Sequence, residues 1–116
     1  MIEQDILEIG DWNFAIEVEN EQTKPVVVFF YSKGCKPCAS FAPVFNKISQ
    51  THKQHFKFVA IDGNLHKASS EDIVKGYPTT VIFNKGKLIS SFNGAATIEF
   101  FSQYINRNLR QIRSMK

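Results

Sequence analysis

The residues with the clearest chemistry are Cys35 and Cys38, the only two cysteines among the 116 residues. Two thiols at this spacing can form a structural disulfide, supply half of a metal site, exchange electrons reversibly, or have no function. A structural disulfide here would close a very small loop and would remove little entropy from the unfolded chain. The spacing alone leaves all four interpretations open, and the surrounding sequence separates them.

A zinc site would need further ligands, since zinc in proteins is bound by about four donors. His52 and His55 follow the cysteine pair after thirteen residues. However, the histidines are separated by only two residues, where such sites use three to five, and a chain of this length folds without a metal. We therefore expect no metal and treat these histidines as surface residues.

The cysteine pair lies where one type of secondary structure gives way to another. Val26–Tyr31 is an unbroken run of six β-forming residues, which is typical of a strand buried on both faces. After Pro37 the apolar residues Phe41, Phe45 and Ile48 recur at helical spacing, which predicts a helix. Pro43 lies within that helix and predicts a kink.

This position favours reversible thiol–disulfide exchange. Cys35 is expected at the helix N-terminus, where free N–H groups and the helix dipole favour a thiolate and lower a cysteine pKa. Lys36 adds a positive charge, and Pro37 fixes the loop without losing a hydrogen bond. Cys38 follows about one turn later on the same side. Cys35 would attack a substrate disulfide, and Cys38 would resolve the intermediate.

The rest of the chain predicts alternating strands and helices. We expect strands at Ile6–Ile9, Phe56–Asp62, Thr79–Phe83 and Lys87–Phe92, the last two joined by a hairpin turn at Asn84-Lys85-Gly86. The order is β-α-β-α-β-α-β-β-α. It indicates an α/β fold with a mixed sheet and helices on both faces, in one domain over residues 1–116.

Three further helices complete this prediction. Asp11 is expected to cap a short helix that reaches Val18. Ser69 and Asp72 have the spacing of a capping box, with Gly76 closing the helix that they open. Thr97 can cap the last helix, whose apolar stripe is Ile98, Phe101, Ile105, Leu109 and Ile112. We expect Trp12 to be a packing residue and His66 to lie on the surface.

These features resemble the thioredoxin family over nearly the whole chain. Gly34-Cys35-Lys36-Pro37-Cys38 is similar to the family motif Trp-Cys-Gly-Pro-Cys, and Pro43 matches the proline of the active-site helix. The resemblance implies a thioredoxin-like fold and a thiol–disulfide oxidoreductase with no cofactor beyond a redox-active Cys35–Cys38 disulfide. Tyr77-Pro78-Thr79 matches the family's cis-proline loop, and Gly94 matches a glycine of the groove. The family resemblance makes Tyr77, Pro78 and Gly94 substrate-binding residues.

The chain also departs from the family pattern. Phe29 and Phe58 stand where the family has the Asp and Lys that handle the proton of the second cysteine. Gly34 replaces the tryptophan before the motif, and Lys36 replaces a glycine within it. A cation there would stabilise the Cys35 thiolate and make the protein more oxidising. The main alternative is a thioredoxin-fold binding module with little or no redox turnover.

The composition of the chain and the distribution of its charges indicate which partners and which cellular location to expect. Residues 1–23 carry seven acids and no Lys or Arg, so we expect this segment to fold back against the basic remainder. Arg107, Arg110, Arg113 and Lys116 form a basic face that we interpret as solvated rather than nucleic-acid binding. No apolar run reaches the roughly 20 residues of a membrane span, and no signal peptide is visible. We expect a cytoplasmic monomer that acts on protein thiols or disulfides and takes electrons from a thioredoxin reductase or another thiol donor.

Overall fold

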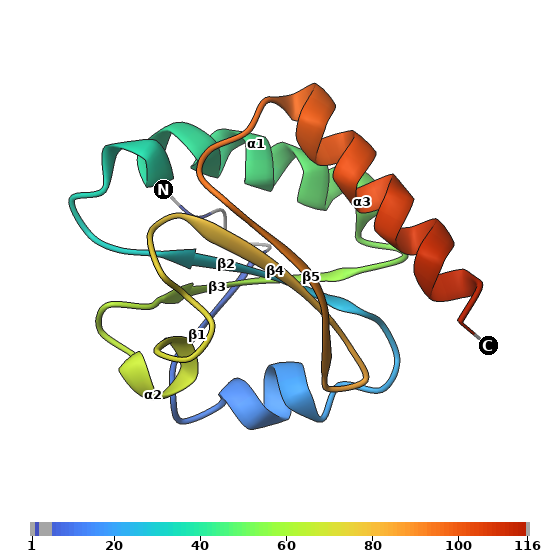
Figure 1. The fold of residues 1–116 in the computed structure, drawn as a ribbon, viewed down its shortest axis with the longest axis horizontal. Helices are drawn as coiled ribbons and strands as arrows, with labels where there is room; N and C mark the ends of the chain where they lie inside the picture. The colour runs from blue at the N-terminus through green and yellow to red at the C-terminus, as the bar shows by residue number, and fades with distance from the viewer. Residues whose placement is uncertain (1, 3–5, 116) are drawn as a thin grey trace.

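The computed structural model describes residue 2 and residues 6–115, which form a five-stranded mixed sheet between helices (Figure 1). The strand order is β1-β3-β2-β4-β5. β1 and β2 run parallel to β3, while β2–β4 and β4–β5 are antiparallel. The strands are β1 (Leu7–Ile9), β2 (Val26–Tyr31), β3 (Lys57–Asp62), β4 (Thr79–Asn84) and β5 (Lys87–Asn93). The predicted α/β fold with a mixed sheet is confirmed.

β2 occupies the centre of the sheet, and all six of its residues are buried. Its neighbours β3 and β4 supply hydrogen bonds on both edges, so an apolar run without alternation satisfies the backbone and buries both faces. The strand ends at Tyr31, and a short loop at this end of the sheet leads into the helix that begins at Lys36. The cysteine pair therefore follows directly after the fully buried central strand of the sheet.

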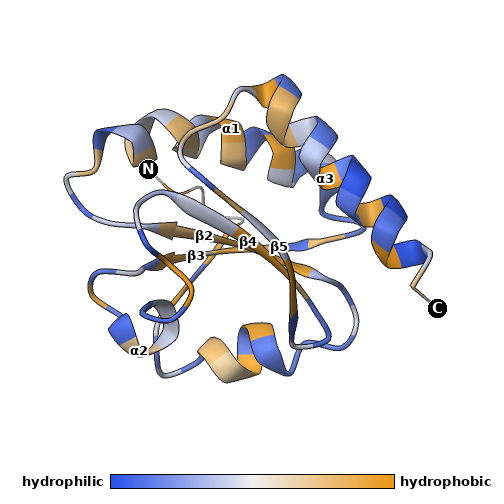
Figure 2. Ribbon diagram, viewed as in Figure 1, coloured by the Kyte–Doolittle hydropathy of each residue, from blue (hydrophilic) through white to orange (hydrophobic). Residues whose placement is uncertain are grey.

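Helices cover both faces of the sheet (Figure 1). α1 (Lys36–His52) and α3 (Ile98–Arg113) lie on one face. The π-helical segment η1 (Ala15–Glu19) and the one-turn α2 (Lys67–Ser70) lie on the other. Figure 2 shows the apolar strands enclosed between these more polar helices. The face under α1 and α3 holds an aromatic cluster that includes Phe29, Phe41, Phe45, Phe58 and Phe101.

Two local signals in the sequence form as predicted. Thr97 caps α3, since its Oγ1 accepts a hydrogen bond from the Phe100 N–H at 3.1 Å. Lys85 and Gly86 both have positive φ, 52° and 83°, and they connect β4 to β5 in a tight hairpin turn. Pro43 lies inside α1 as expected; the kink stays a prediction.

Two predicted helix caps are wrong. Asp11 does not cap η1, which begins at Ala15 after Phe14. The Asp11 carboxylate instead accepts hydrogen bonds from the Ser69 N–H at 2.9 Å and the Ser69 hydroxyl at 2.6 Å. Because Ser69 is engaged there and α2 spans only Lys67–Ser70, the capping box with Asp72 does not form. α2 therefore ends six residues before Gly76, which the sequence had suggested as its end.

Trp12 and Ile98 are more exposed than the sequence suggests. Trp12 was expected to be a packing residue, but 74% of it is exposed, and its ring meets His66 edge-on with centroids 5.2 Å apart. Ile98 was assigned to the apolar stripe of α3, yet it is 38% exposed at the first position of the helix. Tyr104 and Asn108 are buried in that helix instead.

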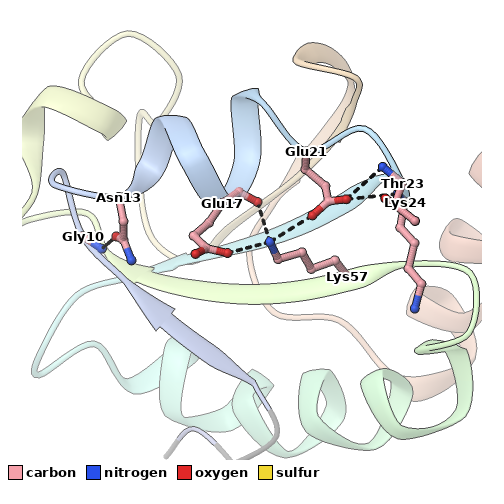
Figure 3. Close-up of polar contacts among 7 residues, drawn as sticks. All are labelled: Gly10, Asn13, Glu17, Glu21, Thr23, Lys24 and Lys57. Carbon is pink, nitrogen blue, oxygen red and sulfur yellow. Dashed lines mark hydrogen bonds and ion pairs between the residues drawn. The ribbon is translucent and has the colours of Figure 1, made fainter.

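The acidic N-terminal segment contacts the basic remainder of the chain, as predicted. Lys57 on β3 bonds Glu17 at 2.7 Å and Glu21 at 3.1 Å (Figure 3). These bonds raise the Lys57 pKa although partial burial opposes the shift, and the Thr23 N–H and Lys57 lower the Glu21 pKa. Glu3 and Asp5, which belong to this acidic segment, lie outside the described residues, as does Lys116 of the basic face.

Arg107, Arg110 and Arg113 are exposed along α3. No helix within the described residues combines the length and the hydrophobicity that crossing a membrane requires.

Candidate active site

Cys35 occupies the N-cap of α1 and is bonded to Cys38 in a disulfide, with their Cα atoms 5.2 Å apart. The Cys35 Sγ accepts a hydrogen bond from the Cys38 N–H at 3.2 Å. The Cys35 carbonyl accepts the first bond of the helix, from the Ala39 N–H at 3.1 Å. The sulfur of Cys35 therefore lies at the positive end of the helix dipole, where a thiolate is stabilised.

The two cysteines differ sharply in exposure. Cys35 is half-buried at the edge of the core, whereas Cys38 is 0% exposed. Cys38 belongs to the aromatic cluster that contains Phe29 and Phe41. A bulky protein substrate can reach only the first sulfur, and the second stays protected from solvent. This asymmetry suits one attacking thiol and one resolving thiol.

The loop around the pair is shaped by its neighbours in the motif. Gly34 has φ +77°, a left-handed conformation that glycine adopts without a steric penalty. Lys36 is the first residue of α1 and is exposed, and Pro37 follows in the first turn, where no hydrogen bond is lost. The chain thus places a cation and a rigid residue between the two sulfurs.

A second loop lies against the same core. The peptide bond between Tyr77 and Pro78 is cis. The Pro78 carbonyl accepts a hydrogen bond from the Gly94 N–H at 2.8 Å, which joins these two predicted site residues. Thr79 anchors the loop, because its hydroxyl contacts the Gly76 carbonyl at 2.6 Å and the Asn93 side chain at 2.9 Å.

Tyr77 packs on the same core as the cysteines. Its half-buried side chain packs against the aromatic cluster that contains Cys38 and borders Cys35. It also covers Gly63, where an added Cβ would lie 2.7 Å from the tyrosine ring. Gly94 has φ +92° and open space around it. The predicted residues therefore form two loops at one end of the sheet, both seated on the same core.

Phe29 and Phe58 are surrounded by other aromatic side chains. Phe29 is fully buried between the rings of Phe41 and Phe45, with centroids 5.6 and 5.0 Å away. The ring of Phe45 also contacts Phe58 at 5.5 Å. Because a phenylalanine has no carboxylate or amine, neither residue can exchange a proton with Cys38.

Tyr31 is a polar side chain in this region that the sequence did not single out. Its hydroxyl donates a hydrogen bond to Glu8 on β1. Burial, together with this bond to the carboxylate, raises the Tyr31 pKa well above its ordinary value. The tyrosine is therefore a neutral hydrogen-bond donor at every physiological pH, and its hydroxyl is already engaged.

The alternative metal site is excluded by distance. Cys38 and His52 lie in the first and last turns of α1, so the helical rise separates them by about 21 Å along the axis. A single ion cannot bind both pairs, because zinc–ligand bonds are only about 2.0–2.3 Å long.

Comparison with known proteins assigns the family. The Thioredoxin family model matches residues 5–107. The chain belongs to the thioredoxin family. It is 32% identical over 108 residues to "Protein disulfide-isomerase like 2-2" of Arabidopsis thaliana, and this match covers 92% of the chain but 24% of that protein. The family resemblance seen in the sequence is therefore confirmed.

Two relatives named as thioredoxins give further matches. "Thioredoxin Y1, chloroplastic" of Arabidopsis thaliana is 31% identical, over 75% of the chain and 51% of that protein. "Thioredoxin C-2" of Corynebacterium nephridii is 28% identical, over 90% of the chain and 96% of that protein. The chain thus spans about a quarter of the disulfide isomerase-like relative, about half of the chloroplastic one and almost all of the bacterial one.

Proposed function

We propose that this member of the thioredoxin family is a thiol–disulfide oxidoreductase acting on protein substrates. The observation that carries the proposal is the Cys35–Cys38 disulfide at the start of α1, with one sulfur accessible and one buried. Reversible exchange needs this combination, because the first thiol must meet a substrate and the second must be protected until the intermediate forms. The family assignment supports the same activity.

The proposed reaction begins with the reduced protein. The Cys35 thiolate attacks one sulfur of a substrate disulfide, which forms a mixed disulfide and releases the other substrate sulfur as a thiolate. Cys38 then loses its proton and attacks the Cys35 sulfur. The Cys35–Cys38 bond forms, the bond to the substrate breaks, and the second substrate sulfur leaves. Two electrons pass to the substrate, whose sulfurs take up two protons, and the reverse sequence oxidises a dithiol.

We assign the substrate groove to the two loops that meet at this end of the sheet. The backbone of Tyr77 and the ring of Pro78 would hold the substrate chain beside Cys35, and Gly94 would leave room for it. The open space at Gly94 and its hydrogen bond to Pro78 support this assignment. Gly34 presents no side chain, so docking depends on the rest of the groove.

The proposed partners are proteins with exposed disulfides or thiols, and a thioredoxin reductase or another thiol system would supply electrons. Lys36 at the first helical position favours the reduced form, which makes the protein more oxidising than ordinary thioredoxin. A monomer in the cytoplasm stays our prediction, without membrane or nucleic-acid binding. The named relatives include a chloroplastic thioredoxin and a disulfide isomerase-like protein, so fractionation of the source cells would test the location.

A trapping experiment tests the proposal directly. Cys38→Ser should accumulate a mixed disulfide with a model protein disulfide, visible as a covalent adduct that dithiothreitol removes. Cys35→Ser should form no adduct, because Cys38 is buried. Wild type should reduce the substrate without accumulating an adduct. Partner binding that survives Cys35→Ser, with no turnover by wild type, would instead support the alternative of a binding module.

A further inference from the structure

Thr80 carries a buried hydroxyl that has no hydrogen-bond partner. The residue is 0% exposed. Within the part of the chain that the structure describes, its Oγ1 is the only buried side-chain nitrogen or oxygen left unpaired. An unpaired buried hydroxyl is destabilising, since water would otherwise satisfy it. A valine of the same shape would remove this cost, so the hydroxyl calls for an explanation.

The sheet register places this hydroxyl on the face covered by α1. Thr80 on β4 lies directly opposite Phe29 on β2 and Phe92 on β5. Directly opposed residues in antiparallel strands point to the same face, and Phe29 and Phe92 both pack on the aromatic cluster under α1 and α3. Phe41 of α1 contacts both of these rings, with centroids 5.6 and 6.1 Å away, so it lies over Thr80.

Cys38 stands next to Phe41 on the same side of α1. Residues three apart on a helix are neighbours on its surface, and Cys38 and Phe41 are both 0% exposed in the same cluster. Thr80 is also the second residue after Pro78, at the end of the sheet where the cysteines lie. The unpaired hydroxyl and the buried sulfur therefore occupy one apolar layer at the same end of the molecule.

Among the described residues, the buried tyrosine hydroxyls on this face are already engaged. Tyr31 donates to Glu8, and Tyr104 shares a hydrogen bond with Ser90 at 2.8 Å. Thr80 thus carries the buried hydroxyl that the described part of this layer leaves available for Cys38.

We propose that Thr80 is a positioning residue that hydrogen-bonds the Cys38 sulfur when the disulfide is reduced. The inference rests on the proposed redox function. Reduction breaks the sulfur–sulfur bond and adds two electrons and two protons, so Cys38 becomes a thiol. A hydroxyl can accept a hydrogen bond from that thiol and can donate one to the thiolate. The hydroxyl that is unpaired in the disulfide form gains its partner in the dithiol form.

This partner would matter at the resolving step. Cys38 must release its proton to solvent before its sulfur attacks Cys35, and the departing substrate thiolate takes up a proton in return. A donated hydrogen bond from Thr80 would stabilise the Cys38 thiolate in surroundings that are otherwise apolar. The Thr80 bond would also favour the reduced protein over the disulfide.

The test compares Thr80→Val with Thr80→Ser in both redox forms. Oxidised and reduced samples, prepared with diamide and with a phosphine reductant, are unfolded in urea. Thr80→Val should leave the oxidised form as stable as wild type or more stable. Relative to that change, it should raise the unfolding equilibrium constant of the reduced form about three- to tenfold, because the reduced form loses the stabilisation of one hydrogen bond. Thr80→Ser keeps the hydroxyl and should restore wild-type behaviour in the reduced form.

A second measurement, the thiol–disulfide equilibrium with glutathione, tests the same hydrogen bond independently of unfolding. Equilibrated with glutathione, Thr80→Val should shift toward the disulfide by the same three- to tenfold factor. Ser90→Ala, which removes a paired hydroxyl on the same face, should not shift this equilibrium. Equal stability changes of Thr80→Val in the two redox forms would mean a purely structural threonine and would overturn the inference. Failure of wild type to reduce a protein disulfide would instead contradict the proposed function, and the stability comparison would still decide the role of Thr80.

Discussion

At the scale of single residues, the chemistry depends on where charges and polar groups stand relative to two sulfurs. Cys35 lies at a helix N-terminus beside the exposed Lys36, while Cys38 lies in an apolar core. Among the described residues, the Thr80 hydroxyl is the one buried side-chain polar group there without a hydrogen-bond partner. The first environment stabilises a thiolate and the second does not. The attacking and resolving roles follow from this contrast.

Lys36→Gln should make the protein less oxidising. The change removes a positive charge next to the Cys35 thiolate, so the equilibrium with glutathione should shift toward the disulfide by about threefold, as expected for one exposed charge at short range. Alkylation followed by mass measurement gives the ratio of the two forms. Lys47→Gln is the matched control, because that exposed lysine lies about 18 Å from Cys35 along the axis of α1, beyond the Debye length of about 10 Å at 0.1 M salt. Equal shifts in the two variants would contradict a local effect.

Residue roles were predictable where they depend on neighbours in sequence, and they failed where the partner is distant. The placement of Cys35 follows from a strand that changes to a helix at Pro37. By contrast, the partner of Asp11 is Ser69, which is 58 residues away in the sequence. The local pattern that predicted Asp11 as a helix cap was therefore wrong. Thr80 could not be distinguished from Thr79 in the sequence, because only the hydrogen bonds of the folded protein show which of the two hydroxyls is paired.

At the scale of elements, the central strand and two helices position the site. β2 delivers the cysteine loop, and β4 begins just after Pro78, so adjacent strands bring the two loops to one end of the sheet. α3 packs beside α1 and completes the aromatic cluster, with Phe101 contacting Phe41 and Phe45 at 5.2 and 5.8 Å. The sequence predicted these elements well, because their apolar patterns are long and periodic. It predicted η1 and α2 poorly, because both are only a turn or so long.

Thr97→Ala should destabilise the fold by about 1 kcal/mol, the usual effect of removing a helix cap. The hydroxyl of Thr97 pairs with the Phe100 N–H, which alanine would leave to solvent. Urea unfolding would measure the change, and Thr97→Ser should retain most of the stability because serine caps equally well. A loss of the same size in Thr97→Ser would show that the methyl group, not the cap, stabilises this end of α3.

At the scale of the whole molecule, the acidic first segment is tied to the basic body. Lys57 on β3 binds both Glu17 and Glu21, so η1 and the chain that follows it are held against the start of β3 (Figure 3). The overall order of strands and helices was predictable from patterning, whereas these long-range pairs were visible only as a balance of charges. This network lies at the start of β3, away from the cysteine loop, and serves stability rather than chemistry.

Stability should fall in acid partly through Glu21. Hydrogen bonds from the Thr23 N–H and Lys57 lower its pKa in the folded protein, so folding favours the ionised carboxylate. Its contribution is present above the ordinary pKa of a glutamate, about 4.3, and is lost as the pH falls through the lower folded pKa. Glu21→Gln should reduce stability by about 0.5 to 1 kcal/mol at pH 7 and by progressively less toward about pH 3. Urea unfolding across this pH range would measure the effect.

Glu19→Gln provides the control for this prediction, since Glu19 is an exposed glutamate in the same segment. It should leave the unfolding free energy unchanged at both ends of the pH range. A pH-independent difference between wild type and Glu21→Gln would contradict the assignment of this carboxylate to the acid transition.

The most direct test of the redox account is the reduction potential of the Cys35–Cys38 pair. The protein would be equilibrated in a series of glutathione and dithiothreitol buffers, alkylated and weighed. The account predicts a reversible two-electron transition with a potential above about −270 mV, the value of thioredoxin. Two thiols that never form a disulfide would contradict it. A reduction potential below about −300 mV, which is typical of structural disulfides, would also contradict it.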